Sequence, residues 1–327
     1  MSKFKVLLTD YTWPDLEIER RILAEADAEL IVAERSDAKS LAILATDADA
    51  IMTNWARVDE TVLTAAAKCR IVARLGIGLD NIDVGVATRR GMMVTNVPDY
   101  CLIEVAEHAL ALVLALARKV GYYNTLAKRE LYQLQSGPAL RRIEGQTLGI
   151  VGFGRIGRKL AEKAAPLGLR ILATSRSPRD VPEGIEWCEL DNLLARSDYV
   201  SLHVPLTPDT RHLIGAAQLA GMKPTAYLIN TARGGLIDMA ALVTALAADR
   251  LAGAALDGHD PEPPDLTQPP YDDPRVIVTP HAAFVSLESL ENLRTRASRQ
   301  VAVALSGGVP ENVVNNSGQS VGHHRGP

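Results

Sequence analysis

The chain has 327 residues, of which 47% are hydrophobic and 23% charged, and its formal net charge is −4 at pH 7. That length suits two domains rather than one core, and the charge excludes a broad basic surface for nucleic acid or a polybasic arm for membranes. Three widely spaced cysteines without a CxxC pair argue against disulfides and structural zinc, so we expect a cytoplasmic protein with no metal site.

The N-terminal part of the chain alternates short β-branched runs with helical patterns, which predicts a parallel α/β sheet. The opening "MSKFKVLLTDYTW" enters the first strand without the apolar core of a secretory signal. Strands are expected at Lys5–Thr9, Glu29–Val32, Ala50–Thr53, Ile71–Leu75 and Met93–Thr95. Helices are expected at Asp15–Ala26, Ala38–Ala45, Glu60–Ala66 and Val84–Arg90. The pattern indicates one small doubly wound domain.

A long apolar helix is expected next, at Ile103–Ala117, which is too short to span a bilayer. The stretch "QLQSGPALRRIEGQ" follows it as an irregular connection. A second series of strands starts at "TLGIVGFG" and continues with "RILAT", "DYVSLHV", "AYLINT", "GAALD" and "VIVTP". Helical segments lie between most of them, so we expect a second, larger α/β domain.

The chain ends with one more helix and an extended piece. The helix is expected at Leu287–Leu305 and the extended piece is "PENVVN". A helix this late in the chain can return to the first domain, which would make that domain discontinuous. The polar segment Gly318–Pro327 is expected to be a tail, and its His323-His324 pair is a weak metal signal.

The segment Gly152-Phe153-Gly154-Arg155-Ile156-Gly157 follows an apolar strand and opens a helix, which favours a dinucleotide-binding loop over a glycine-rich turn without a ligand. Gly152 permits the tight turn, Gly154 lets the pyrophosphate approach, and Gly157 lets helix and strand touch. The amides of Arg155 and Ile156 would then point at the phosphates.

Four segments together resemble one known family. They are "RLGIGLDNIDVGVATRRGMMVTNVPDY", "GQTLGIVGFGRIG", "LINTARGGLIDMAALVTAL" with "LAGAALDGHDPEPP", and "VIVTPHAAF". In this order they are similar to the D-isomer-specific 2-hydroxyacid dehydrogenases, the group of phosphoglycerate dehydrogenases, glyoxylate/hydroxypyruvate reductases and C-terminal-binding-protein-like members. The resemblance runs from about Lys5 to Asn315.

The resemblance implies a Rossmann NAD(P)-binding domain, residues 100–285, inserted into a flavodoxin-like substrate domain made of residues 1–99 and 286–327. Both would be doubly wound parallel sheets, with the active site in the cleft between them. The resemblance also implies a homodimer built around the long helix that begins near Ile103.

Three catalytic residues follow from the resemblance, and each suits its chemistry. His281 after "VIVTP" would be the acid/base, since an imidazolium can supply a proton near neutral pH. Glu262 would orient its ring, although Asp257 and Asp260 compete for that role. Arg233 would bind the substrate carboxylate and carbonyl with its planar fork.

The loop that contains Glu262 departs from the family pattern. Most relatives have a hydrophobic pair after the aspartate, but Gly258-His259 stands there in this chain. His259 is therefore a second histidine near the expected site, for which we expect a supporting or surface role.

The opposite side of the site is expected in the N-terminal domain. Backbone amides around Ile77 and Gly78 would bind the substrate carboxylate. A neighbouring loop offers Asn54, Trp55 and Arg57 for the distal group of the substrate. Either Arg57 or Arg74 could favour a second acidic group, although either could also be a solvated surface residue.

The remaining expected cofactor contacts follow from the resemblance and are Val204, Pro205, Thr210, Thr231, Ala232 and Asp257. The family's second strand is "RILAT", and its NAD-preferring members usually carry an aspartate where Ser175 stands. Serine removes the repulsion of a 2′-phosphate, and Arg176 can pair with it. NADP(H) is therefore favoured and NAD(H) stays possible, since Arg176 and Arg179 could also be exposed loop charges.

The resemblance thus implies an NAD(P)-dependent oxidoreductase that transfers a hydride between a nicotinamide cofactor and a 2-keto or D-2-hydroxy acid, mainly in the reductive direction. Its partner would be a small acid rather than nucleic acid or a membrane. Two alternatives stay open: a nucleotide-sensing, co-repressor-like binding protein, and a phosphite-type dehydrogenase.

Overall fold

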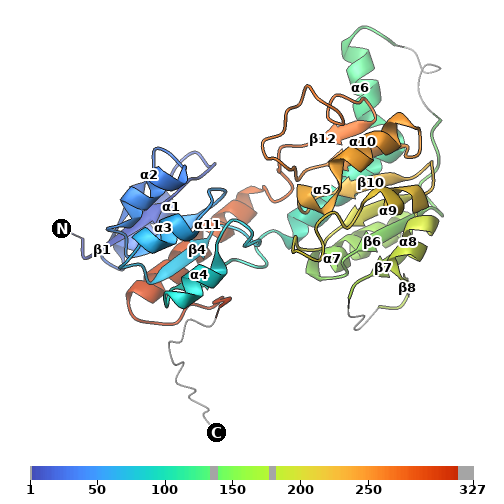
Figure 1. Cartoon of the computed structure of the whole chain (residues 1–327). Helices are drawn as coiled ribbons and strands as arrows, with labels where there is room; N and C mark the ends of the chain where they lie inside the picture. Colours follow the sequence, from blue (N-terminus) through green and yellow to red (C-terminus); the bar gives the residue numbers. More distant parts are fainter. Residues whose placement is uncertain (1, 133–138, 177–181, 316–327) are drawn as a thin grey trace. The chain divides into compact units, whose positions relative to one another are not determined.

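The computed structural model describes residues 2–132, 139–176 and 182–315. The chain divides into two compact units, shown in Figure 1. The first unit is Met1–Tyr100 with Ser286–Pro327, and the second is Cys101–Val285. Each unit contains one sheet in which all paired strands are parallel. This confirms the predicted fold class.

The first unit contains a five-stranded sheet in the order β2-β1-β3-β4-β5, which is the flavodoxin-like order. Its strands are β1 (Phe4–Leu8), β2 (Ala28–Val32), β3 (Ala50–Thr53), β4 (Ile71–Arg74) and β5 (Met93–Thr95). Helices cover both of its faces, so the central strands β3 and β4 are buried at every residue. Strands buried on both faces have continuous apolar runs, which explains why they were predictable.

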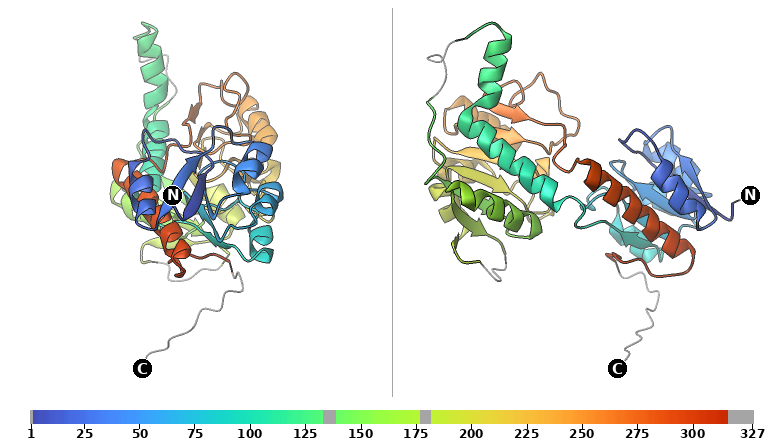
Figure 2. Two further views of the ribbon diagram at one scale, coloured as in Figure 1. Left: turned by 90° about the vertical axis from the view of Figure 1, so that its left-hand side faces the viewer. Right: turned by 180° about the vertical axis from the view of Figure 1, so that it is seen from behind.

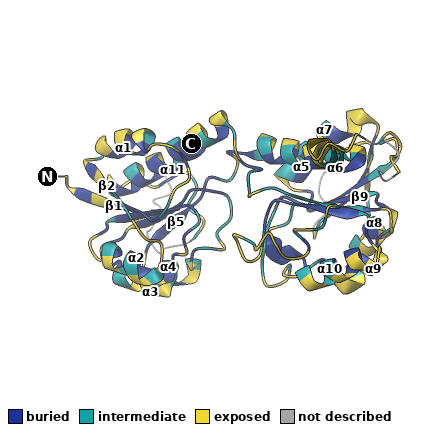
Figure 3. Ribbon diagram, turned by 90° about the horizontal axis from the view of Figure 1, so that it is seen from above, coloured by how far each residue is buried: buried dark blue, intermediate teal, exposed yellow. Residues whose placement is uncertain are grey.

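Two layers of helices enclose this sheet. They are α1 (Glu17–Ala24), α2 (Ala38–Ala45), α3 (Glu60–Ala65), α4 (Val84–Arg89) and α11 (Leu287–Leu305). Figure 3 shows α1 and α11 on one face and α2, α3 and α4 on the other, with exposed residues directed outward. The carboxylates of Asp37 and Asp59 accept hydrogen bonds from the first amides of α2 and α3, which explains where these helices begin.

The helix α11 packs in the first unit although it follows the whole second unit in sequence. Its Arg294 guanidinium lies 2.8 Å from the fully buried carboxylate of Glu19 in α1. Beyond the helix, Val313 forms a single antiparallel bridge with Thr95 of β5. The segment "PENVVN" is therefore one bridge rather than a strand, and it attaches the end of the described chain to the sheet edge.

The second unit contains a seven-stranded sheet in the order β12-β11-β10-β9-β6-β7-β8. Its strands are β6 (Thr147–Val151), β7 (Arg170–Thr174), β8 (Ile185–Trp187), β9 (Tyr199–Leu202), β10 (Tyr227–Asn230), β11 (Gly253–Leu256) and β12 (Val276–Val278). The strand order reverses between β6 and β9, and ligands of such sheets bind at that switch point. The edge strand β8 has the sequence IEW, in which a glutamate interrupts the apolar residues, and the sequence did not predict it.

Helices α5 (Leu102–Arg118) and α7 (Arg155–Ala164) pack together on one face of this sheet, as Figure 3 shows. The other helices are α8 (Leu190–Arg196), α9 (Ala216–Gly221) and α10 (Met239–Ala247), with the 3₁₀ helices η2 (Ala165–Leu167) and η3 (Gly234–Leu236). The helix α6 (Val120–Lys128) was not predicted. Lys119 adopts a left-handed conformation, φ 54°, that separates α6 from α5. None of the residues of α6 is buried, and Figure 2 shows it projecting from its unit.

Within the described residues, no helix is long and apolar enough to cross a bilayer, and no cluster of three or more metal-ligating side chains occurs. The three cysteines form no disulfide, and burial raises the pKa of the Cys69 thiol to about 12. Arg179 and the pair His323-His324 lie outside the described residues, as do positions 133–138 of the predicted irregular connection. Positions 139–146 of that connection contain no helix or strand.

Candidate active site

The glycine loop has the geometry that a dinucleotide requires. Gly152 has φ 100°, and a Cβ there would lie 2.6 Å from the carbonyl group of His203. A Cβ on Gly157 would lie 2.4 Å from the carbonyl oxygen of Gly152, so helix and strand approach as closely as the motif demands. A Cβ on Gly154 would meet no heavy atom within 4 Å, which leaves its backbone open to a ligand.

The first amides of α7 also suit a phosphate. The helix begins at Arg155, and no side chain caps it at Gly154. Its first N–H groups therefore lack intrahelical acceptors and offer donors to an anion. At the end of β10, the buried hydroxyl of Thr231 has no hydrogen-bond partner among the described residues. The residues present thus fit a bound dinucleotide.

Ser175 and Arg176 lie beside this loop. Val151 of β6 pairs with Thr174 of β7, and the Gly152 amide donates to the Thr174 carbonyl oxygen at 2.9 Å. Ser175 is therefore the first residue beyond β7, next to the turn of the glycine loop. Arg176 follows with an exposed side chain.

The other predicted cofactor residues of the second unit also follow carboxyl ends of strands. Val204, Pro205 and Thr210 follow β9, and Thr210 Oγ1 donates to the Pro205 carbonyl oxygen at 2.7 Å. That bond closes the loop on itself. Thr231 and Ala232 follow β10. These residues all lie at the carboxyl ends of the strands. Their contacts with a cofactor stay predictions.

The structure brings His281 and Glu262 together. His281 Nδ1 lies 2.9 Å from one carboxylate oxygen of Glu262 and 3.1 Å from the other. Of the two competing acids, Asp260 pairs with Arg211 at 3.3 Å, and Asp257 binds backbone amides. Glu262 is therefore the carboxylate that can set the ring's tautomer.

Asp257 clamps the turn on which His281 stands. Its fully buried carboxylate accepts from the amides of Ala282 at 2.8 Å and Ala283 at 3.0 Å, and from Thr279 Oγ1 at 2.6 Å. These bonds hold His281 at φ 52°, in the left-handed region. Residues other than glycine adopt this conformation mainly where surrounding contacts impose it. The predicted contact of Asp257 with the cofactor stays a prediction.

Arg233 follows β10 in a loop shaped by Asn230. The buried Asn230 side chain donates to the Arg233 carbonyl oxygen at 2.8 Å and accepts from the Ala232 amide at 3.0 Å. The guanidinium Nη1 donates to the Ala232 carbonyl oxygen at 3.0 Å. The Arg233 side chain is half-buried at the same sheet edge as His281 and Glu262.

The substrate residues predicted in the first unit follow β3 and β4. Asp10 organises the first loop, because its carboxylate accepts from the amides of Asn54, Trp55 and Ala56 at 2.6–3.1 Å. The Arg74 side chain is buried, with its guanidinium 5.8 Å from the centre of the Trp55 ring, whereas Arg57 is exposed.

The second loop of the first unit approaches Arg74 closely. A Cβ on Gly76 would lie 2.9 Å from the Arg74 guanidinium carbon, and the φ of 156° at this position favours glycine. The carbonyl oxygen of Ile77 accepts from the Asn96 side chain at 2.7 Å. This bond fixes the backbone next to Gly78.

The model of the D-isomer-specific 2-hydroxyacid dehydrogenases, NAD-binding domain, matches residues 110–283. The chain belongs to this family. A relative, the glyoxylate reductase of Aeropyrum pernix, is 41% identical over 281 residues, covering 83% of this chain and 84% of the relative.

Two further proteins are similar to this chain, one of them a longer relative and the other a solved complex. The D-3-phosphoglycerate dehydrogenase of Mycobacterium tuberculosis is 39% identical over 295 residues, which are 89% of this chain but only 56% of the relative. The solved structure of an acyclic imino acid reductase in complex with NADPH and D-Arg has a TM-score of 0.86 and 27% identity, covering 95% of this chain and all of that one.

Several residues of this dehydrogenase site escaped the sequence analysis. His108 in α5 lies 3.1 Å from Thr279 Oγ1 and 3.6 Å from the Asp257 carboxylate. The only signal was a histidine beside Glu107 in a mainly apolar helix, which is a weak signal. Thr279 and Asn230 are ordinary residues at strand ends, and only their contacts show that they shape the site.

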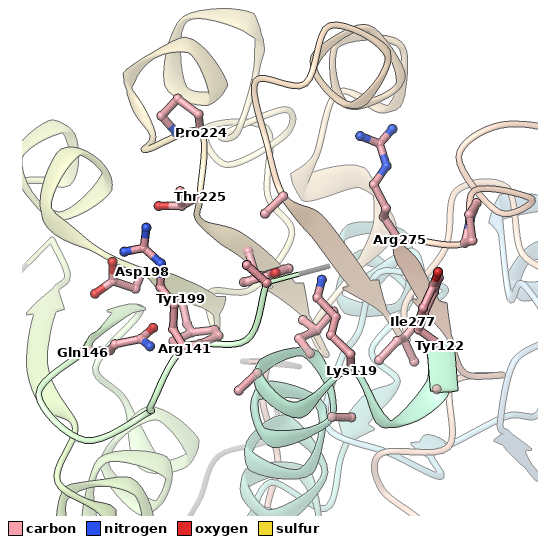
Figure 4. A pocket seen from close by; sticks show the side chains of 18 residues that line it. Lys119, Tyr122, Arg141, Gln146, Asp198, Tyr199, Pro224, Thr225, Arg275 and Ile277 are labelled. Carbon is pink, nitrogen blue, oxygen red and sulfur yellow. The ribbon is translucent and has the colours of Figure 1, made fainter. Parts of the chain in front are cut away.

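A cavity of about 610 Å³ lies at the amino-terminal ends of strands in the second sheet, as Figure 4 shows. The rings of Tyr199 and Tyr227 stack there at 5.7 Å, and Lys119 Nζ lies 4.5 Å from the Tyr227 ring centre. Both tyrosines begin their strands, whereas the dehydrogenase site follows strand ends. The cavity contains no predicted site residue.

Proposed function

We propose that the protein is a nicotinamide-dependent D-2-hydroxyacid dehydrogenase that reduces small 2-keto acids. The proposal rests mainly on the His281–Glu262 pair, whose Nδ1 and carboxylate oxygen lie 2.9 Å apart. The pair lies at the carboxyl ends of the strands of the second sheet, as do Arg233 and the glycine loop. Proton donor, orienting carboxylate and anion-binding guanidinium are the groups that reduction of a 2-keto acid needs. A nicotinamide bound at the glycine loop supplies the hydride.

His281 provides the proton in this proposal. Nδ1–H donates to Glu262, which directs Nε2 away from the carboxylate and toward a substrate. As the carbonyl carbon is reduced, the Nε2 proton passes to the carbonyl oxygen, and the ring is left neutral with Nδ1–H still held. Glu262 holds the Nδ1 proton before and after the transfer, so the ring keeps one orientation throughout.

Arg233 would hold the acid. A guanidinium can bind the carboxylate of a 2-keto acid and also contact its carbonyl oxygen, where negative charge develops. The loop geometry imposed by Asn230 keeps this side chain half-buried, so water competes less with the anion than at a surface site.

The first unit would recognise the rest of the substrate. We propose that the amides of Ile77 and Gly78 bind the carboxylate, and that Asn54, Trp55, Arg57 and Arg74 set the preference for the distal group. The glyoxylate reductase name of a 41% identical relative supports a small acid. Arg57 is the exposed cation of this set, so it is suited to a second negative charge.

We propose a preference for NADPH. Ser175 stands directly beyond β7, where an aspartate would repel a 2′-phosphate, and the neighbouring Arg176 has an exposed guanidinium that can pair with it. NADH would bind less tightly through the same loop.

We also propose that the protein forms a homodimer through α6 and residues 129–132 that follow it. None of the residues of α6 is buried, and Val120, Leu131 and Tyr132 leave 58%, 47% and 98% of their surface exposed. Exposed apolar side chains at the start of a projecting helix and just beyond its end indicate a covered face. Light scattering of Tyr132→Glu tests the dimer, and an unchanged dimer would contradict this face.

Three cysteines without a disulfide support a reducing, cytoplasmic location.

Oxidation of NADPH and of NADH, followed with glyoxylate, hydroxypyruvate, pyruvate and phosphorylated keto acids, tests the proposed function. We expect turnover of at least one acid, faster with NADPH. Tight nucleotide binding without turnover of any acid would contradict the proposal and favour a nucleotide sensor. Reduction of NADP by phosphite, without keto acid turnover, would favour a phosphite-type dehydrogenase.

A further inference from the structure

The pair Gly258-His259 lies between the two loops that carry Arg233 and His281. A Cβ on Gly234 would lie 2.1 Å from the carbonyl carbon of His259. A Cβ on Gly258 would lie 3.2 Å from the Cα of Arg233. The backbone of the pair is therefore in direct contact with the Arg233 loop; Gly234 must be glycine there, and Gly258 keeps its side of the contact tight.

The side chain of His259 points the other way, to the turn of His281. Its Nε2 lies 2.9 Å from the carbonyl oxygen of Thr279, and the same oxygen accepts from the His281 amide at 3.0 Å. A carbonyl oxygen can only accept, so Nε2 of His259 carries a proton. Pro280, between Thr279 and His281, has no N–H to donate, so the Thr279 carbonyl oxygen is where His259 can reach the backbone before His281.

The other nitrogen of His259 limits its protonation. Nδ1 is buried and has no hydrogen-bond partner among the described residues, while the whole residue is 7% exposed. A proton on Nδ1 would be a buried donor without an acceptor, which is costly. The tautomer that fits therefore carries its proton on Nε2, where the Thr279 carbonyl oxygen holds it, so it is not free for a substrate.

We propose that His259 is a positioning residue for His281. Its bond to the Thr279 carbonyl and the Asp257 clamp hold the turn from two sides, so that His281 keeps φ 52° and its ring stays on Glu262. Gly258 allows this support to reach from the Arg233 loop. The inference rests on the proposed function, because it assigns His259 to the reaction of His281.

Two substitutions separate the hydrogen bond from the packing. His259→Phe keeps a ring against Tyr271, whose ring centre lies 5.4 Å from that of His259, but removes the donor. His259→Gln keeps an N–H donor near the place of Nε2. With glyoxylate or hydroxypyruvate, whichever the wild type reduces faster, we expect His259→Phe to lower kcat about tenfold and to change KM less than about threefold. His259→Gln should recover kcat to within about threefold of the wild type.

A kcat of His259→Phe within about twofold of the wild type would overturn the proposal. A His259→Gln variant as slow as His259→Phe, with both variants folded by circular dichroism, would overturn it too. Solvent deuterium isotope effects on kcat give a further measure, since a misplaced proton donor should increase the effect in His259→Phe alone.

Nuclear magnetic resonance of the full chain with ¹⁵N-labelled histidine gives a reading that does not need turnover. The wild type should show His259 as the neutral ring protonated at Nε2, and a downfield Nδ1–H resonance of His281 that His259→Gln keeps and His259→Phe loses. A His259 protonated at Nδ1, or an unchanged His281 resonance in His259→Phe, would overturn the inference. Absence of keto acid turnover by the wild type would instead contradict the proposed function.

Discussion

Both units place their predicted site residues after the carboxyl ends of parallel strands, but they hold them differently. In the second unit, charged side chains support one another: Glu262 contacts His281, and Asp257 clamps the turn that carries it. In the first unit, the carboxylate of Asp10 organises backbone amides, and the exposed Arg57 extends from that loop. The second arrangement suits proton transfer, and the first suits recognition of a substrate's outline.

This difference makes a kinetic prediction. Substitutions of His281, Glu262 and Arg233 in the second unit should lower kcat, because these groups act in the transition state. Substitutions of exposed side chains in the first unit should change KM and the choice of acid. A variant that violates this division would break the comparison.

The largest effect is expected from His281→Asn, which removes the proton donor. We expect kcat to fall about 10³-fold, with the NADPH dissociation constant changed little. Glu262→Gln keeps a hydrogen bond but no charge, and it should lower kcat less. Steady-state kinetics and fluorescence titration measure both. A His281→Asn enzyme with more than about a tenth of wild-type kcat would contradict the role.

Arg233→Ala is expected to lower kcat/KM about 10²- to 10³-fold, because the carboxylate and the developing charge both lose their partner. Arg233→Lys should recover only part of this, since an ammonium lacks the planar fork. Equal kinetics for the lysine variant and the wild type would show that a point charge is sufficient.

Ser175→Asp sharpens the comparison within the second unit, because it should alter the cofactor and leave the chemistry intact. We expect KM for NADPH to rise about tenfold with kcat almost unchanged. Arg176→Ala should raise it less. The KM values for both cofactors decide the matter: a wild type with a lower KM for NADH, at equal kcat, would overturn the NADPH preference.

Arg57→Ala tests the first unit. KM for dianionic keto acids such as oxaloacetate should rise about 3- to 10-fold, and KM for pyruvate should stay the same. Arg35→Ala is the matched control, because Arg35 is an exposed arginine of the same unit that pairs with Asp37. Equal losses with both acids would remove Arg57 from substrate selection.

The smallest effect concerns the pH dependence of the free energy of unfolding, through His203 directly after β9. Desolvation lowers the pKa of His203 to about 4, and its Nε2 lies 2.8 Å from Ser201 Oγ. The unfolded chain therefore binds a proton between about pH 6.5 and 4 that the folded chain does not, so stability falls as pH falls through that window. Because the residue keeps part of its surface in water, we expect about 1 kcal/mol.

Urea unfolding at pH 7.5 and pH 5 measures this loss, and His203→Gln is the control that cannot take up the proton. The variant should lose less stability than the wild type over the same interval. The same loss in both proteins would assign the pH dependence to other groups.

The sequence predicted the strands of both sheets well, because strands buried on both faces leave continuous apolar runs such as Ala50–Thr53. It missed α6, because a helix with no buried residue has no apolar stripe facing a core. It also missed β8, whose three residues, IEW, are interrupted by a glutamate and leave no apolar run.

At the site, the glycine loop was predictable because its order of strand, loop and helix is local. The choice of Glu262 over Asp257 and Asp260 rested on the family's spacing, and the structure places Glu262 against His281. The roles of Asp10, His108 and Thr279 depend on contacts between residues far apart in sequence. No local pattern announces such contacts.

The chirality of the product tests the central claim most directly. Pyruvate and hydroxypyruvate would be reduced with NADPH by the wild type and by His281→Asn, and the lactate and glycerate separated on a chiral column. We expect the D isomer from at least one of the two acids with the wild type, and almost no product with His281→Asn. Formation of the L isomer, or an undiminished yield with His281→Asn, would contradict it.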